Sequence, residues 1–218
     1  CGDHAPAEAL PKSQQADPLH YDPKALASAP PFLPGGLLNK FTVRAFNEAW
    51  YRKAPKHREG ELQEIAPFFH PLDGVQDWNR IYGPAGFLQY QFAVPNEAAH
   101  LVPRALEVLR QVGAPSFLTV LKRFGHSNPA PLSFPIPGWT LAADVPAAVP
   151  GLLKALDQLD EEVAAAGGRI YLAKDSRQST NAFFQGYSHL PGFISLCQPK
   201  SMPQRYDSDL WSRIYYRQ

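Results

Sequence analysis

A lysine at the end of a short apolar run is the residue best placed for chemistry. Residues 167–177 read Gly-Gly-Arg-Ile-Tyr-Leu-Ala-Lys-Asp-Ser-Arg, so that two glycines end a helical pattern and residues 170–173 predict a buried strand leading to Lys174. An ammonium group beside apolar residues can bind an anion or stabilise negative charge at a reaction centre. Taken alone, the stretch fits a solvated lysine beyond a strand end equally well.

Two glutamines form a second candidate group. In the strand predicted over residues 87–95, alternation places Gln89 and Gln91 on one face, while Tyr90 and Phe92 point to the other. Because a buried amide needs hydrogen-bond partners, two amides on one face indicate the polar wall of a cavity for a hydroxylated ligand. The alternative is the solvent-facing side of an antiparallel sheet, which the pattern alone favours somewhat.

The remaining polar residues carry weaker signals. Lys122 stands beside Arg123 at the end of a predicted strand, where one of the two can reach a cavity while the other meets solvent. Tyr82 lies in a corner rich in proline and glycine. The acidic residues of a later helix fit a solvated face; they are Asp157, Asp160, Glu161 and Glu162.

Known catalytic and metal-binding signatures are missing from the sequence. The seven histidines show no metal-ligand spacing, so that no metal site is expected. No phosphate-binding glycine loop and no nucleophile motif occurs.

The elements that must position these residues alternate in a recognisable order. Strand, helix, strand, strand, helix and strand predict an α+β fold with a ferredoxin-like βαββαβ antiparallel sheet, both helices on one face and the other face free. Peripheral helices and Pro-rich loops complete this prediction. The sheet strands are expected over residues 87–95, 116–124, 132–145 and 170–173, the third of them interrupted by Pro135, Pro137 and Gly138. The peripheral helices are expected over residues 37–51, 180–187 and 210–216.

Composition sets the broad class of the protein. The chain has 218 residues, of which 44% are hydrophobic and 19% charged, as in globular proteins with a real core. A net charge of +1 gives no electrostatic case for nucleic acid. No apolar run is long enough to span a membrane, and Cys1 and Cys197 form no metal-binding motif.

The composition of the chain changes after its first 36 residues. Residues 1–36 predict a Pro-rich connecting segment, and residues 37–218 a single domain. The only methionine is Met202, and the chain begins at Cys1 without a leader of the charged-then-apolar kind. We therefore expect a fragment whose N-terminal part is missing.

Six sequence strings carry a specific resemblance: residues 50–53 (WYRK), 69–73 (FHPLD), 78–80 (WNR), 82–92 (YGPAGFLQYQF), 131–139 (PLSFPIPGW) and 173–177 (AKDSR). They resemble one enzyme family, the decaprenylphosphoryl-β-D-ribose 2-oxidases, which are FAD-dependent oxidoreductases of the vanillyl-alcohol-oxidase class. The resemblance is to the C-terminal half of the family and runs from about residue 2 to residue 213.

The resemblance implies a substrate-binding (cap) domain whose sheet covers a flavin held by an FAD-binding domain that is absent from this chain. It implies that Lys174 stabilises negative charge at the flavin and the substrate, and that Tyr171 contacts the cofactor. It places the substrate beside a set of pocket residues, namely Gln89, Gln91, Tyr82 and Lys122. Where related mycobacterial enzymes carry Asn and Cys, this chain has Thr140 and Ala142, so that this part of the pocket wall is smaller and lacks the thiol.

The implied reaction oxidises the ribose 2-hydroxyl of a polyprenylphosphoryl pentose to a ketone, in the first half of an epimerisation to arabinose that supplies cell-wall arabinan. A partner keto-reductase would complete the epimerisation. We expect a protein that is cytoplasmic or peripheral to the inner membrane. The lipid-linked substrate implies peripheral membrane contact, although the sequence shows no evident amphipathic anchor. The alternatives are a sugar-lactone or polyol oxidase of the same class and a non-catalytic ligand-binding module.

Overall fold

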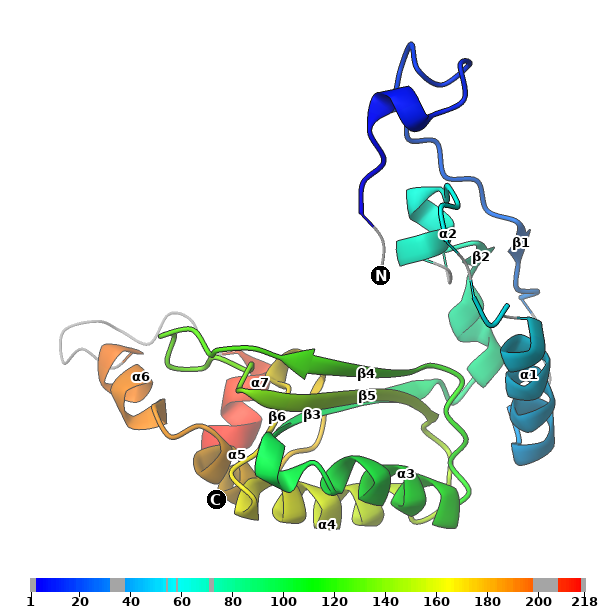
Figure 1. Ribbon diagram of the computed structural model, residues 1–218. Helices are drawn as coiled ribbons and strands as arrows, with labels where there is room; N and C mark the ends of the chain where they lie inside the picture. The colour runs from blue at the N-terminus through cyan, green and yellow to red at the C-terminus, as the bar shows by residue number, and fades with distance from the viewer. Residues whose placement is uncertain are drawn as a thin grey trace. The chain divides into compact units, whose positions relative to one another are not determined.

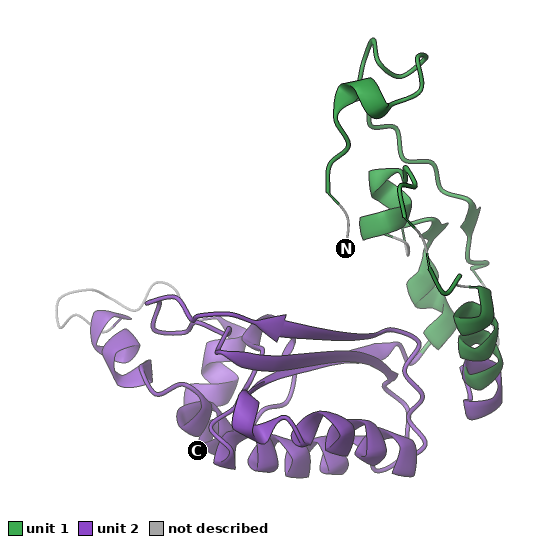
Figure 2. Cartoon of the chain, viewed as in Figure 1, with its two compact units in different colours: residues 1–37, 44–84 green, residues 38–43, 85–218 purple. Residues whose placement is uncertain are grey.

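The chain divides into two compact units, which are described separately. In the computed structural model, residues 3–31, 38–53, 55–57, 59–70, 73–197 and 208–216 are described, so that Cys1 and Met202 lie outside the described residues. One unit comprises residues 1–37 and 44–84, and the other residues 38–43 and 85–218 (Figure 2).

A four-stranded antiparallel sheet forms the centre of the second unit. Its strands are β3 (Phe87–Pro95), β4 (Thr119–Phe124), β5 (Gly138–Pro146) and β6 (Arg169–Ile170). They lie in the order β4-β5-β3-β6, and every neighbouring pair is antiparallel. The predicted mixture of helix and strand and the predicted antiparallel sheet are confirmed.

Two amphipathic helices cover one face of this sheet, as Figure 1 shows. They are α3 (Leu101–Gln111) and α4 (Leu152–Ala165), and each turns a stripe of apolar residues inward. The apolar face of β3, which carries Tyr90, Phe92 and Val94, packs against these stripes. This leaves the face with Gln89 and Gln91 on the side away from the helices.

Two strand predictions are corrected by the structure. The strand expected over residues 132–145 begins only at Gly138, because Pro135 and Pro137 have no N–H for a sheet ladder. The strand expected over residues 170–173 ends at Ile170, and Leu172–Lys174 forms a 3₁₀ turn. This short edge strand begins next to Gly168, where a Cβ atom would lie 2.6 Å from the carbonyl oxygen of Ala93.

The C-terminal part of the second unit forms a smaller cluster. It contains α5 (Thr180–Gly186), α6 (Leu190–Cys197) and α7 (Asp209–Trp211), the last followed by a π-helical turn over Ser212–Tyr216. The helix α6 replaces a loop that the sequence predicted between the two terminal helices. The buried members of this cluster are Phe183, Tyr187, Leu190 and Ile214.

The first unit is built from short elements. Strands β1 (Ala27–Ser28) and β2 (Val75–Gln76) pair in parallel, so that part of the predicted connecting segment takes part in a small sheet. Arg80 joins the two ends of this unit, because its Nη1 donates to the carbonyl oxygen of Ala29 at 2.9 Å. Helix α2 (Ile65–Phe69) lies in this unit, and helix α1 (Lys40–Lys53) belongs to it from Arg44 onward; neither helix has a buried residue. Among the described residues, no helix has the length and hydropathy needed to cross a membrane.

Candidate functional site

The sheet face that the helices leave uncovered carries a row of paired polar side chains. Gln89 Nε2 donates to Asp144 Oδ1 at 3.0 Å, and Gln91 Nε2 donates to Thr140 Oγ1 at 3.1 Å. Both glutamines are half-buried, and each bond joins β3 to its neighbour β5. The two amides are therefore oriented by hydrogen-bond partners within the sheet.

Asp144 is the member of this row that the sequence prediction missed. Only 2% of its surface is exposed, and it faces the same side as Thr140 because the two are four positions apart on one strand. Burial raises the pKa of Asp144, while the hydrogen bond from Gln89 and the positive charge of Lys174 partly offset this rise. The sequence did contain a sign of this residue, because an aspartate within an apolar strand needs a specific hydrogen-bond or ionic partner.

Lys174 lies beside this row, at the end of the 3₁₀ turn that follows β6. It is half-buried and lines a small cavity together with Gln89. The positive charge of Lys174 lowers the pKa of Asp144 and so offsets part of the rise that burial causes. The structure thus brings together Lys174, Gln89 and Asp144, a cation, an amide and a carboxyl group that come from three separate elements.

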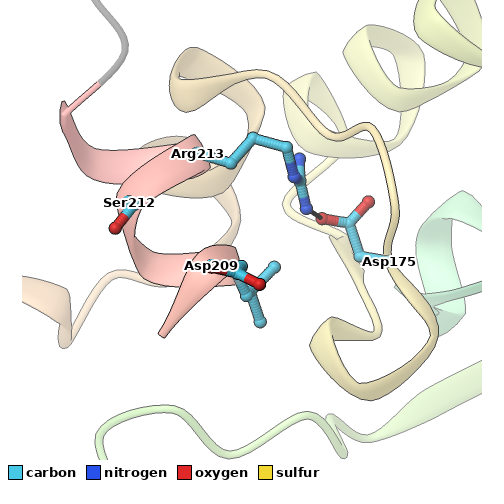
Figure 3. A pocket seen from close by; sticks show the side chains of 5 residues that line it. Asp175, Asp209, Ser212 and Arg213 are labelled. Atoms are coloured by element: carbon cyan, nitrogen blue, oxygen red, sulfur yellow. Dashed lines mark hydrogen bonds and ion pairs between the residues drawn. The ribbon is translucent and has the colours of Figure 1, made fainter. Parts of the chain in front are cut away.

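The turn that carries Lys174 is fixed from its C-terminal side by Asp175. Asp175 Oδ1 accepts from the backbone N–H groups of Arg177 at 3.0 Å and Gln178 at 2.8 Å. Asp175 Oδ2 accepts from Arg213 Nη2 at 2.5 Å, across the hollow shown in Figure 3. The C-terminal segment, 38 positions further along the chain, therefore closes onto the residue next to Lys174.

A second ion pair holds the same turn against helix α4. Arg177 pairs with Asp157 and, at 2.9 Å, with Asp160, whose Oδ1 also accepts from the Tyr90 hydroxyl. The prediction that Asp160 lies on a solvated helix face is wrong, because only 2% of its surface is exposed. Burial raises the pKa of Asp160, and Arg177 opposes that rise. A charge pair so deeply buried fixes the path of the chain through residues 174–177.

An aromatic patch adjoins the polar row on the same sheet face. The Tyr171 backbone N–H donates to the Gln91 carbonyl oxygen at 2.9 Å. The centroid of the Tyr171 ring lies 4.5 Å from that of Phe134. Phe134 and Ile136 pack with Ala93 in a small apolar cluster. Phe134, Ile136 and Ala93 are buried, so that Tyr171 is a half-buried aromatic residue at the edge of this cluster.

The other predicted site residues lie at the margin of this arrangement or in the other unit. Lys122 is exposed on β4, directly opposite Thr140 in the register of the sheet. Tyr82 belongs to the first unit, where it is buried in the 3₁₀ turn Trp78–Tyr82 and lies edge-on to Trp78. Within the described part of the chain, no group of His, Cys, Asp or Glu side chains could hold a metal ion.

Two curated proteins are similar to nearly the whole chain. The chain is 41% identical over 213 residues to decaprenylphosphoryl-β-D-ribose oxidase of Mycolicibacterium smegmatis, a match that covers 98% of the chain and 46% of that enzyme. It is 35% identical over 221 residues to an uncharacterized protein in the mprA 5′ region of Streptomyces coelicolor, covering 97% of the chain and 59% of that protein.

The resemblance that the sequence strings predict is thereby confirmed along nearly the whole chain. The chain spans about half the length of the curated relatives that it matches. No protein-family model matches the chain.

Proposed function

We propose that this chain is the substrate-binding domain of an FAD-dependent oxidoreductase that oxidises a secondary alcohol of a polyprenylphosphoryl pentose. The observation that carries the proposal is that Lys174, Gln89 and Asp144 lie near one another: Gln89 donates to Asp144, and Lys174 lines a small cavity with Gln89 and acts on the Asp144 carboxyl. The similarity to the mycobacterial oxidase supports an oxidase activity and a ribose substrate. The FAD-binding domain would lie outside this chain.

The residues of the uncovered face suit the environment of a flavin. Tyr171 would contact the ring system, held in place by the buried ring of Phe134, and Lys174 would lie near its polar edge. A bound flavin would supply the acceptor for the hydride that leaves the sugar carbon. The Lys174 ammonium would stabilise negative charge that develops at this edge, which is worth more in a site screened from water.

The polar row would recognise the sugar. Amides offer both a donor and an acceptor, so that Gln89 and Gln91 can each bind a hydroxyl group while they remain bonded to β5. Thr140 keeps Gln91 in place, and the small side chain of Ala142 leaves space between the two amides. Lys122, which lies opposite Thr140 in the register of the sheet, would lie at the margin of the substrate pocket. Oxidation at the ribose 2-hydroxyl, followed by a partner keto-reductase, would give the arabinose epimer.

The fold that we propose for the second unit is ferredoxin-like. Its elements follow one another as β3, α3, β4, β5, α4 and β6, and the two central strands are the first and third of this series. A sheet of this kind has one face free of helices. That free face is where the proposed site lies.

The direct test is Lys174→Ala in the longer enzyme that contains this chain and its flavin domain. We expect the bound flavin to remain oxidised when substrate is added, because the variant cannot stabilise the developing charge, with a loss of roughly a hundredfold or more in the reduction rate. Stopped-flow absorbance of the flavin gives this rate. Lys154→Ala, which removes an exposed lysine of α4, is the matched control. Reduction at the wild-type rate in Lys174→Ala would overturn the role of this lysine.

A polyol or sugar-lactone oxidase is the second candidate, because paired amides bind hydroxyl groups of many sugars. Turnover of an aldonolactone without turnover of a phosphopolyprenyl pentose would favour it. Binding of a sugar without any flavin reduction would instead indicate a non-catalytic module.

A further inference from the structure

Three side chains form a polar cluster on the helix-covered side of the sheet. They are Tyr90 of β3, Asp160 of α4 and Arg177, and we call them the helix-side cluster. The Tyr90 hydroxyl and Arg177 Nη2 both donate to Asp160 Oδ1, each at 2.9 Å. The Arg177 guanidinium also lies over the Tyr90 ring, with its Cζ atom 5.5 Å from the ring centroid. Tyr90 and Asp160 are 4% and 2% exposed, so that the cluster belongs to the interior of the unit.

The chemistry of the helix-side cluster fixes its geometry. Burial and the neighbouring Asp160 carboxylate raise the pKa of Tyr90, so that its hydroxyl keeps its proton and donates. Hydrogen bonds depend on direction, whereas apolar contacts do not. Burying an ion pair also costs desolvation free energy that apolar packing would avoid. The cluster is therefore better suited to fixing positions than to adding stability.

The edge of β3 beside Gln89 has no strand pairing on the side of β6. In the described part of the chain, β6 pairs with β3 only at Phe92 and Ala93. One further backbone bond follows, from the Tyr171 N–H to the Gln91 carbonyl oxygen. Strand pairing therefore ends before Gln89, so that side-chain contacts hold the chain after Tyr171 at this edge.

The chain crosses from one face of β3 to the other between Lys174 and Arg177. Lys174 acts on Asp144 of the uncovered face, whereas Arg177 pairs with α4 on the opposite face. Gln89 and Tyr90 are neighbours on a strand, so that their side chains point to opposite faces. One small cavity is nevertheless lined by Gln89, Tyr90, Lys174 and Arg177. The step from Lys174 to Arg177 therefore joins the polar row to the helix-side cluster.

We infer that the helix-side cluster sets the separation between the Lys174 ammonium and the Gln89 amide, which makes its three members positioning residues. Because Tyr90 stands between Gln89 and Gln91, the cluster fixes the lysine relative to the strand segment that carries both amides. The inference rests on the proposed function for what Lys174 does, but not for where Lys174 lies.

The variant Tyr90→Phe tests the inference, because it removes one hydroxyl and keeps the buried ring. In the longer enzyme with its flavin domain, we expect flavin reduction by saturating polyprenylphosphoryl ribose to slow roughly tenfold, since small displacements of a catalytic group are costly in rate. The substrate concentration for half the maximal rate should change by less than about twofold, because both amides remain on β3. Stopped-flow absorbance gives both values.

A second readout needs neither flavin nor substrate. In the 218-residue chain, Lys174 should react several-fold faster with acetic anhydride in Tyr90→Phe than in the wild type. Mass spectrometry measures this, with the exposed Lys154 as the internal reference. Arg177→Gln should show a larger increase, and Arg177→Lys should restore part of the protection, because it keeps a cation beside Asp160.

Val108→Ala is the matched control, because it shortens a buried side chain of α3, a helix that carries no member of the cluster. It should lower the thermal midpoint about as much as Tyr90→Phe does, while Lys174 and flavin reduction stay as in the wild type.

Two outcomes would overturn the inference. They are a Lys174 that reacts equally in all variants, and an equal rise of its reactivity in Val108→Ala, which would leave the cluster a role in stability alone. A wild-type enzyme whose flavin is not reduced by the sugar would instead refute the proposed function. The reactivity of Lys174 would still test the cluster in that case.

Discussion

Asp144 sets the electrostatics of the uncovered sheet face. Its carboxyl group is buried and accepts from Gln89, and its pKa is raised because burial outweighs the attraction of Lys174. A carboxyl in this condition costs free energy when it is ionised. The folded chain therefore holds this proton more tightly than the unfolded chain does.

The variant Asp144→Asn tests this balance. Since the folded pKa lies above the unfolded value of about 3.9, this group's contribution to stability falls as the pH rises through the two values. Asparagine keeps an oxygen for Gln89 but does not ionise, so that we expect the variant to be more stable by about 1 kcal/mol at neutral pH. The gain should vanish in acid, and urea unfolding of both proteins across this pH range measures it.

The control is Asp144→Ala, which leaves the Gln89 amide without its partner. It should be less stable than the wild type by about 2 kcal/mol in acid. This deficit should shrink by about 1 kcal/mol at neutral pH, because only the wild type then bears the cost of an ionised buried carboxylate. If the asparagine variant were also less stable at neutral pH, the ionised carboxylate would be net stabilising and the argument from burial would be wrong. Asp160 has a raised pKa as well, but it contributes equally to both proteins.

Sequence periodicity placed Gln89 and Gln91 on one face, because alternation along a strand depends only on neighbouring residues. It could not find the partners of these amides, since Asp144 and Thr140 come from another strand and register is a property of the fold. The burial of Asp160 was missed for the same reason. Its apparent position on a polar helix face did not reveal that Arg177 and Tyr90 would cover it.

At the scale of elements, the 3₁₀ turn with Lys174 depends on segments that are distant in sequence. Helix α4 holds it through Arg177, and the turn after α7 holds it through Arg213, which also donates from Nη1 to the Gln178 carbonyl oxygen at 3.0 Å. The sequence predicted a strand here because residues 170–173 are apolar. Local propensity cannot reveal that Asp175 forms an ion pair with Arg213, because the two residues are distant in sequence (Figure 3).

The variant Arg213→Gln should loosen this turn. It removes the charge that faces a buried carboxylate, so that we expect a loss of about 2–3 kcal/mol in the free energy of unfolding. Lys174 should also become several-fold more reactive toward acetic anhydride, as followed by mass spectrometry. Lys154, an exposed lysine of α4, supplies the internal reference.

Arg213→Lys keeps the charge and should restore part of the protection of Lys174. Arg104→Gln removes an ion pair with Glu162 on the helical side of the same unit and should leave the reactivity of Lys174 unchanged. An unaltered Lys174 in Arg213→Gln would mean that the ion pair stabilises the C-terminal segment without positioning the lysine.

At the scale of the whole molecule, the two units differ in how many apolar side chains they bury. All three clusters of buried apolar residues lie between residues 85 and 218. The other unit buries only Ala29 and Tyr82 among its described hydrophobic residues. The sequence indicated a long Pro-rich segment at the start, but it did not show that residues up to 84 would build so small a core.

This difference predicts that residues 85–218 fold without the preceding part of the chain. A single sheet with two helices on it buries most of the apolar surface available to that unit, which is the main source of cooperative stability. A protein made of residues 85–218 should therefore unfold in one cooperative step, with a midpoint within about 5 °C of that of the whole chain. Thermal circular dichroism of both proteins gives the two midpoints. A shorter protein that melts without a transition would show that the sheet depends on residues 1–84, and the two units would then have to be regarded as one cooperative domain.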